Sequence, residues 1–181
     1  MYSSNQLRLT VYASLFAALT AAGAFIAIPM GPVPIVLQNF FVFLTGLLLG
    51  TRWGLASVSV YLLAGVLGLP VFAGGTGGIG RFLGPTGGYL IGYLPAVWII
   101  GWIAHRGKHR PFFDLLGMVC GALTVYLFGV PWLKVLTGMS WTKALAVGMM
   151  PFIIGDALKI AAALPVVKAL RPMIRIKDSP R

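Results

Sequence analysis

The run VYASLFAALTAAGAFIAI, residues 11–28, decides the class of this chain, because its 18 residues include no charged side chain. A helix needs about 20 predominantly apolar residues to span a bilayer. The run therefore predicts a membrane-spanning helix. A cleaved signal peptide is the alternative, but its apolar core is usually only about 7 to 15 residues long and follows a clearly basic segment. Here Arg8 is the one basic residue before the run.

Further apolar runs follow along the chain, separated by proline, glycine and basic residues. The composition agrees with a membrane protein, because 59% of the 181 residues are hydrophobic and the mean hydropathy is +0.93. Only 9% are charged, against about 25% in soluble domains. We predict an all-α membrane protein with six transmembrane helices in a single integral membrane domain, residues 1–181. The predicted spans are about 11–28, 35–50, 53–69, 86–104, 111–133 and 149–170.

The basic residues predict the orientation of the chain. Lys and Arg number 14 against 3 Asp and Glu, which gives a net charge of +11. They gather at the ends of apolar runs and form no polar face, which argues against nucleic-acid binding and favours the positive-inside pattern. With six spans and a cytoplasmic N-terminus, ten of the 14 fall on the cytoplasmic side. These are Arg8, Arg52, Arg106, Lys108, Arg110, Lys168, Arg171, Arg175, Lys177 and Arg181. We therefore expect both termini in the cytoplasm.

The segment GGTGGIGRFLGPTGG, residues 74–88, contains glycines at the G-x-G-x-x-G spacing of a dinucleotide-binding turn. That motif also requires a preceding strand and an acidic residue about 20 positions later, and a P-loop requires Gly-Lys-Ser/Thr. Neither context is present, and the segment falls on the predicted external side. Thr86 instead opens the fourth predicted helix, where free N–H groups and the nearby Arg81 favour an anion. A plain connection between helices is the alternative.

Asp156 and Lys159 are charged residues inside the last predicted span. They are three positions apart and therefore share a helix face. Lys159 precedes Lys168 by nine residues, which places it roughly 13 Å from the cytoplasmic end. Charges at this depth usually face the protein interior and mark a substrate route. A purely structural ion pair is the alternative. Gln38 and Asn39 could add hydrogen bonds to a solute, or could serve a contact between helices.

Three segments resemble the BioY family, the biotin-binding S components of energy-coupling factor (ECF) transporters. They are GLPVFAGGTGGIGRFLGPTGGYLIGY (68–93), DALK (156–159) and ASLFAALTAAGAF (13–25). The resemblance implies six helices, a biotin pocket near the external face, and a location in a bacterial or archaeal cell membrane. It also implies a transmembrane T component and two ATPase subunits as partners. No Walker motif occurs in the chain, so we expect no enzyme activity of its own and no cofactor, with ATP hydrolysis left to the partners.

The resemblance also implies the residues that contact the ligand. Asp156 would accept a hydrogen bond from a ureido N–H of biotin, and Lys159 and Arg81 would donate to its carboxylate or carbonyl, with the order left open. Phe40, Phe72, Tyr89 or Tyr93 could form an apolar wall, although each could equally be ordinary packing. The loop from Pro29 to Pro34 and the glycine segment are expected to cover the ligand. The predicted substrate-binding residues are Asp156, Lys159, Arg81, Gln38, Gly75, Gly78, Thr86 and Tyr89.

The first apolar run contains two rows of small side chains with a spacing of four residues. Ala13, Ala17 and Ala21 form one row, and Ser14, Ala18 and Ala22 form the other. Rows of this kind let helices approach closely in lipid. In the family an alanine row on this helix meets the T component, so the resemblance places the partner surface on Ala13, Ala17 and Ala21. Packing within the subunit is the alternative.

Other functions are less well supported by the sequence. An S component for another small vitamin is the nearest alternative. An intramembrane enzyme is less favoured, because His105 and His109 have i,i+4 spacing but no carboxylate beside them, so we expect no metal site. The chain also has no glutamate and no Gly-x-Ser-x-Gly motif. A channel would need polar residues along several spans, whereas here they gather toward one side.

Overall fold

The computed structural model describes residues 4–29 and 32–174. Positions 30–31 of the predicted covering loop and the predicted cytoplasmic cations Arg175, Lys177 and Arg181 lie outside the described residues. The described helices are α1 (Ser4–Phe25), α2 (Gln38–Val66), α3 (Ile79–Phe82), α4 (Gly87–Arg106), α5 (Pro111–Thr137), α6 (Trp141–Gly148) and α7 (Met150–Leu170). Two short strands, β1 (Ala27–Ile28) and β2 (Ile35–Val36), pair antiparallel between α1 and α2.

The helix α2 doubles back on itself at Gly50, whose φ of 71° and ψ of −165° are not helical. A hydrogen bond of 2.5 Å from Gln38 to the Tyr61 hydroxyl requires this reversal. In a straight helix, residues 23 positions apart would be separated by roughly 35 Å. Glycine is needed here because side chains strongly disfavour this backbone conformation. The two halves of α2, residues 38–49 and 51–66, are therefore antiparallel.

The turn at Gly50 packs directly against α4. A Cβ atom at Gly101 would lie 2.6 Å from the backbone of both Gly50 and Thr51, closer than real Cβ contacts. Glycine at position 101 therefore lets α4 cross the α2 turn at backbone distance. Small residues commonly allow such close crossings between membrane helices.

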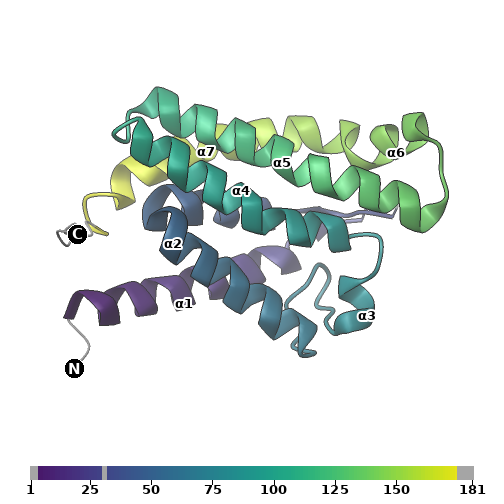
Figure 1. Ribbon diagram of the computed structural model, residues 1–181, viewed down its shortest axis with the longest axis horizontal. Coiled ribbons are helices and arrows are strands. Elements are labelled where there is room, and N and C mark those ends of the chain that lie inside the picture. The colour runs from purple at the N-terminus through teal and green to yellow at the C-terminus, as the bar shows by residue number, and fades with distance from the viewer. Residues whose placement is uncertain (1–3, 30–31, 175–181) are drawn as a thin grey trace.

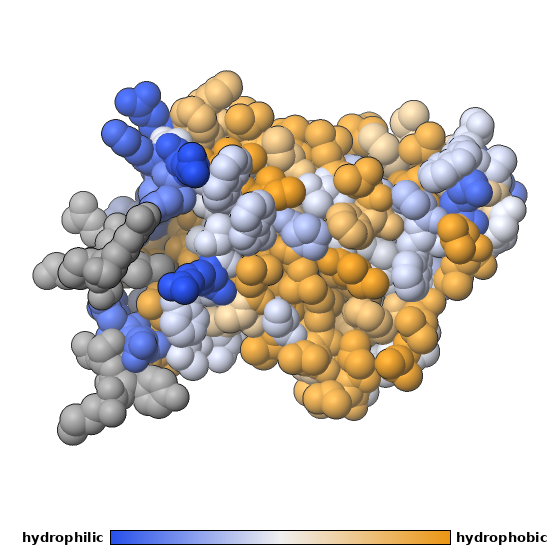
Figure 2. Space-filling model, viewed as in Figure 1, coloured by the Kyte–Doolittle hydropathy of each residue, from blue (hydrophilic) through white to orange (hydrophobic). Residues whose placement is uncertain are grey.

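The helices form an elongated bundle in which both described chain ends lie at the same end (Figure 1). The helix α1 lies along one side, while α4, α5 and α7 run side by side on the other. The short helices α3 and α6 lie at the opposite end. Hydrophilic surface lies at both ends of the bundle and is most extensive at the end that holds the termini (Figure 2). This arrangement agrees with the predicted placement of both termini on one side of the membrane.

The outer surface of the bundle is apolar over most of its length (Figure 2). Large side chains on this surface are widely exposed, including Leu67 at 83%, Val135 at 80% and Leu127 at 70%. Only a lipid environment removes so many apolar groups from water. Among the described residues, five stretches are long and apolar enough to cross a membrane, with α2 counted once and α6 with α7 counted together. The expectation of an all-α membrane protein is confirmed.

Some boundaries differ from the predicted spans. The first helix begins at Ser4, seven positions before the predicted span, because a helix can extend beyond the hydrocarbon into the interface. The last predicted span is preceded by α6, and a break at Met149 (φ −134°, ψ −52°) separates α6 from α7. The paired strands β1 and β2 were not expected, because two residues are too few to produce an alternating pattern.

Candidate functional site

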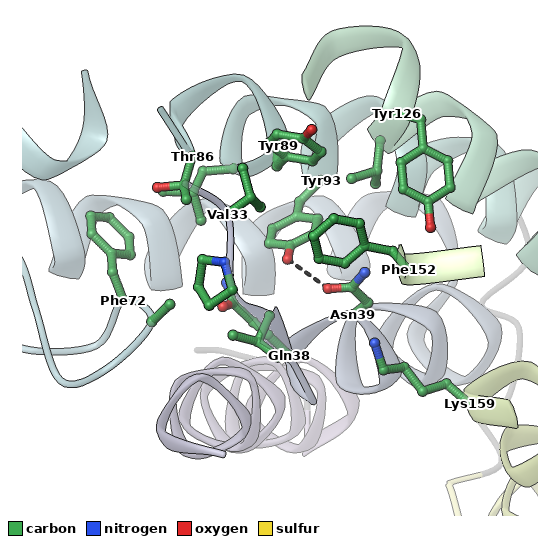
Figure 3. Close-up of a pocket in the computed structure, with 15 residues that line it drawn as sticks. Val33, Gln38, Asn39, Phe72, Thr86, Tyr89, Tyr93, Tyr126, Phe152 and Lys159 are labelled. Carbon is green, nitrogen blue, oxygen red and sulfur yellow. Dashed lines mark hydrogen bonds between the residues drawn. The ribbon is translucent and has the colours of Figure 1, made fainter. Parts of the chain in front are cut away.

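A small cavity lies inside the bundle, in the half away from the chain termini (Figure 3). Its volume is about 40 Å³, well below the roughly 300 to 1,000 Å³ of typical small-molecule sites. Its walls are mostly apolar and aromatic, with a few polar groups. The lining residues are Val33, Pro34, Val36, Gln38, Asn39, Phe72, Ala73, Thr86, Tyr89, Leu90, Tyr93, Val125, Tyr126, Phe152 and Lys159.

Asp156 is the centre of a buried polar cluster beside this cavity. Its carboxylate accepts hydrogen bonds from the Lys159 ammonium at 2.9 Å, the Asn39 amide at 3.3 Å and the Tyr126 hydroxyl. Tyr93 in turn donates to the Asn39 carbonyl at 2.9 Å (Figure 3). Asp156 is 4% exposed and Lys159 9% exposed. Side chains from α2, α4, α5 and α7 thus satisfy one buried charge pair together, as such pairs require.

Two further hydrogen bonds fix the walls of the cavity. Gln38, at the start of α2, is held by Tyr61 on the second half of the same helix. Tyr89 donates to the carbonyl of Gly148 at 2.8 Å, at the break between α6 and α7. That carbonyl is one of those left unbonded where a helix ends. Tyr89 therefore ties α4 to the break that precedes α7.

The cavity is covered by the hairpin of β1 and β2 together with the glycine segment. Val33 and Pro34 contribute from the hairpin connection, Thr86 contributes from the glycine segment, and Phe72 lies two residues before that segment. The backbone N–H of Gly74 donates to the carbonyl of Ala24 at 3.2 Å, which ties the glycine segment to the last turn of α1, just before the hairpin. Both segments expected to cover a ligand therefore border the cavity through described residues.

The structure brings together only part of the predicted site. Gln38, Thr86, Tyr89 and Lys159 line the cavity, whereas Arg81, Gly75 and Gly78 are not among its lining residues. Asp156 lies immediately behind the cavity, since its three partners Asn39, Tyr126 and Lys159 all line it. Of the four suggested wall aromatics, Phe72, Tyr89 and Tyr93 line the cavity, whereas Phe40 packs in the other half of the core.

The glycine segment has structural reasons for its composition. Gly75 and Gly78 have φ values of +69° and +89°, where glycine is strongly preferred. Arg81 lies in the short helix α3 beside them, and its Nε is buried without a hydrogen-bond acceptor among residues 4–29 and 32–174. The adjacent Phe82 packs against the cavity residue Phe72, with ring centroids 6.2 Å apart. Arg81 is therefore the chain neighbour of a residue that packs on the cavity wall.

Tyr126 and Phe152 border the cavity, but they were not predicted from the sequence as site residues. Tyr126 interrupts the apolar run of α5, and a hydroxyl at hydrocarbon depth is a signal that was available. Phe152 gives no such signal, because aromatic residues are common throughout this chain. Asn39 and Tyr93 were named only as possible contacts, and the cluster around Asp156 contains both.

The two rows of small residues on α1 differ in exposure, since adjacent helix positions point about 100° apart. Ala13 and Ala17 are 5% and 6% exposed and pack into the core, and Ala21 is partly buried. Ser14, Ala18 and Ala22 are exposed. Within the described residues, the second row is therefore the one that remains accessible to another subunit.

The two histidines lie at the opposite end of the bundle. The rings of His105 and His109 have centroids 6.1 Å apart. In the part of the chain that the structure describes, no group of three or more His, Cys, Asp or Glu side chains could hold a metal ion.

Comparison with known proteins finds similarity along most of the chain. The family model described as the BioY family matches residues 1–176. A probable biotin transporter BioY of Pyrococcus horikoshii is 45% identical over 158 residues, which cover 87% of this chain and 93% of that protein. The biotin transporter BioY of Thermotoga maritima is 38% identical and covers 92% of this chain and 98% of its own length. A crystal structure of the S-component for biotin from an ECF-type ABC transporter superposes with a TM-score of 0.87 at 32% identity, covering 95% of both chains.

Proposed function

We propose, since this chain belongs to the BioY family, that it captures biotin in the cavity beside Asp156 as the S component of an ECF-type transporter. The observation that carries the proposal is the buried Asp156–Lys159 pair of α7, which accepts hydrogen bonds from side chains of α2 and α5 beside an aromatic cavity. Placing a charge pair at this depth costs free energy, and such residues usually mark a substrate pathway. Its position in the half of the bundle away from the cytoplasmic end suits a solute that arrives from outside.

The chemistry of the cluster fits the ureido ring of biotin. That ring presents N–H donors next to a carbonyl acceptor. Asp156 and Lys159 present an acceptor and a donor 2.9 Å apart, which is the complementary pattern. Asp156 would accept from the ureido N–H, and Lys159 would donate to the ureido carbonyl. The apolar ring carbons and thioether would pack against Tyr93 and Phe152.

Arg81 would bind the carboxylate of biotin. Its buried Nε has no acceptor among the described residues, so an incoming anion would satisfy it. The arginine lies next to Phe82, which packs on the cavity residue Phe72. A carboxylate tail that left the cavity along the glycine segment would therefore pass close to this guanidinium. Gln38, Thr86 and Tyr89 would complete the polar lining, with Gly75 and Gly78 giving the segment its shape.

Binding requires the cavity to enlarge, because about 40 Å³ holds little more than ordered water. The hairpin of β1 and β2 and the glycine segment are short coverings attached to long helices, so they are the elements expected to move. The Asp156 carboxylate is already shared among three donors. A carboxylate has about four acceptor positions, so a ligand N–H would share Oδ2 with Tyr126 or replace one of these hydrogen bonds.

The transport cycle would use other subunits, namely a T component in the membrane and two ATPases. The exposed row Ser14, Ala18 and Ala22 on α1 is the part of the predicted helix surface that another membrane helix could approach closely. This revises the predicted partner surface, because Ala13 and Ala17 pack inside the chain.

The proposal is tested by calorimetry of the purified protein in nanodiscs with biotin and with its methyl ester. We expect saturable binding of biotin and weaker binding of the ester, which has lost the anionic tail. Arg81→Gln should weaken biotin but have little further effect on the ester. If Lys159→Gln, and not Arg81→Gln, weakens biotin while leaving binding of the ester unchanged, then Lys159 is the residue that binds the carboxylate. Absence of any heat with biotin, together with binding of a different vitamin, would refute the substrate.

A further inference from the structure

A second cleft lies at the end of the bundle that holds the termini, far from the Asp156 cluster. It is open and has a volume of about 660 Å³. The start of α5 forms one side and the last turns of α7 form the other. Its apolar wall includes Leu164 and Pro165, and its polar rim includes His109 and Lys168.

Asp114 and Arg171, which both line the cleft, form an ion pair with each other. The two terminal nitrogens of Arg171 donate to the two carboxylate oxygens of Asp114 at 2.8 and 3.0 Å. Arg171 also donates to the carbonyls of His109 at 3.2 Å and Leu47 at 3.4 Å. Both Asp114 oxygens are thus neutralised, so this carboxylate does not repel an anion.

Lys168 supplies the uncompensated positive charge of the cleft. It is exposed, and the ion pairs found in residues 4–29 and 32–174 are Asp156 with Lys159 and Asp114 with Arg171. Arg110, which precedes α5, adds a second exposed cation nearby. The cleft and its rim are therefore positive, and Figure 2 shows more hydrophilic surface at this end than at the other.

The cleft lies at the depth of a membrane interface. On the neighbouring helix α4, the Arg106 guanidinium sits 5.2 Å from the ring centroid of the exposed Trp102. Tryptophan with a basic residue beyond it is typical of the headgroup level. Next to the cleft, Phe112 is 67% exposed at the first turn of α5. A molecule in this cleft would contact cations on the side of the aqueous phase and hydrocarbon on the side of the membrane interior.

Three prolines make the cleft rigid, since Pro111, Pro165 and Pro172 all contribute to its walls. Proline fixes its own backbone, so little conformational freedom is lost on binding. We propose that this cleft binds the phosphate headgroup of an anionic phospholipid, with Lys168 contacting the phosphate and Leu164 contacting the upper acyl chain. A phospholipid fits better than a soluble phosphate compound because the basic rim continues directly into apolar wall.

The proposal is tested by native mass spectrometry of the detergent-purified protein with equal amounts of phosphatidylglycerol and phosphatidylcholine of the same acyl chains. We expect preferential retention of phosphatidylglycerol, and a reduction of about fivefold in Lys168→Gln, from the usual contribution of one basic residue at an anionic surface. Lys168→Arg should retain the lipid. Lys143→Gln is the matched control, because it removes the same charge at the opposite end of the bundle.

Several results would overturn the lipid site. Equal retention of the two lipids would show that the cleft does not select an anionic headgroup. Equal losses in Lys168→Gln and Lys143→Gln would show that lipid retention depends on the net charge of the protein and not on this cleft. Displacement of phosphatidylglycerol by millimolar glycerol phosphate would identify a soluble ligand instead. Unchanged lipid retention with loss of transporter partner subunits in Lys168→Gln would identify a protein interface. Biotin binding is measured in parallel and should be unaffected, so this proposal stands or falls separately from the function proposed above.

Discussion

Replacement of Asp156 by asparagine tests the proposed biotin site most directly. Asparagine keeps the size of the side chain and can still accept one hydrogen bond, but it removes the negative charge. Hydrogen bonds to a charged group contribute about 1.5 to 3 kcal/mol. Loss of one such bond from the ligand therefore predicts biotin binding that is about 10- to 150-fold weaker. Isothermal titration calorimetry in nanodiscs measures this directly.

The same substitution also affects the stability of the protein. It leaves Lys159, 9% exposed, without its counter-charge. Removing one partner of a buried ion pair costs about 3 to 5 kcal/mol, so a lower unfolding midpoint is expected as well. Affinity must therefore be compared only among preparations that remain monodisperse and folded at the assay temperature.

Asp114→Asn is the matched control for both effects. It breaks the ion pair of Asp114 with Arg171, so it should also lower the unfolding midpoint. Asp114 precedes Tyr126 by 12 positions on α5, which places it roughly 18 Å from the polar cluster. Biotin affinity should therefore be unchanged in this variant. Our reasoning is refuted if Asp156→Asn binds biotin within about twofold of the unmodified protein, or if Asp114→Asn weakens binding equally.

Three further substitutions test separate parts of the structure. Tyr126→Phe removes a donor that competes with the ligand for the buried carboxylate, so biotin should bind about 2- to 10-fold more tightly in calorimetry; weaker binding would contradict this competition. Gly101→Ala places a methyl group 2.6 Å from the α2 turn and should cost about 1 to 3 kcal/mol in unfolding assays, whereas Gly80→Ala enters open space and should not. Ala18→Leu should reduce co-purification of the transporter partners while biotin binding persists; an equal loss in Ala146→Leu, on exposed α6, would argue against α1 as the partner surface.

The arrangement of apolar runs and charges predicted the class of the protein because those features act locally. A run such as residues 11–28 has no charge along 18 positions and is long enough to span a bilayer, which can be read from the run itself. The charges of Asp156 and Lys159 were equally informative, because a buried charge in hydrocarbon needs partners wherever the helix is placed. The family resemblance added the ligand, which no periodicity in the chain could have supplied.

The partners of Asp156 were decided by tertiary structure alone. Asn39 and Tyr126 are 117 and 30 positions away from it, and only the packing of α2 and α5 against α7 brings them to one carboxylate. The reversal at Gly50 was predicted, because the spans 35–50 and 53–69 end and begin on either side of it, but the contact of Gln38 with Tyr61 that it creates was not. Which row of small residues on α1 remains exposed was likewise undetermined by spacing, since both rows repeat every four residues. A sequence fixes how costly each group is to bury, whereas the contacts that offset this cost depend on which distant segments meet in space.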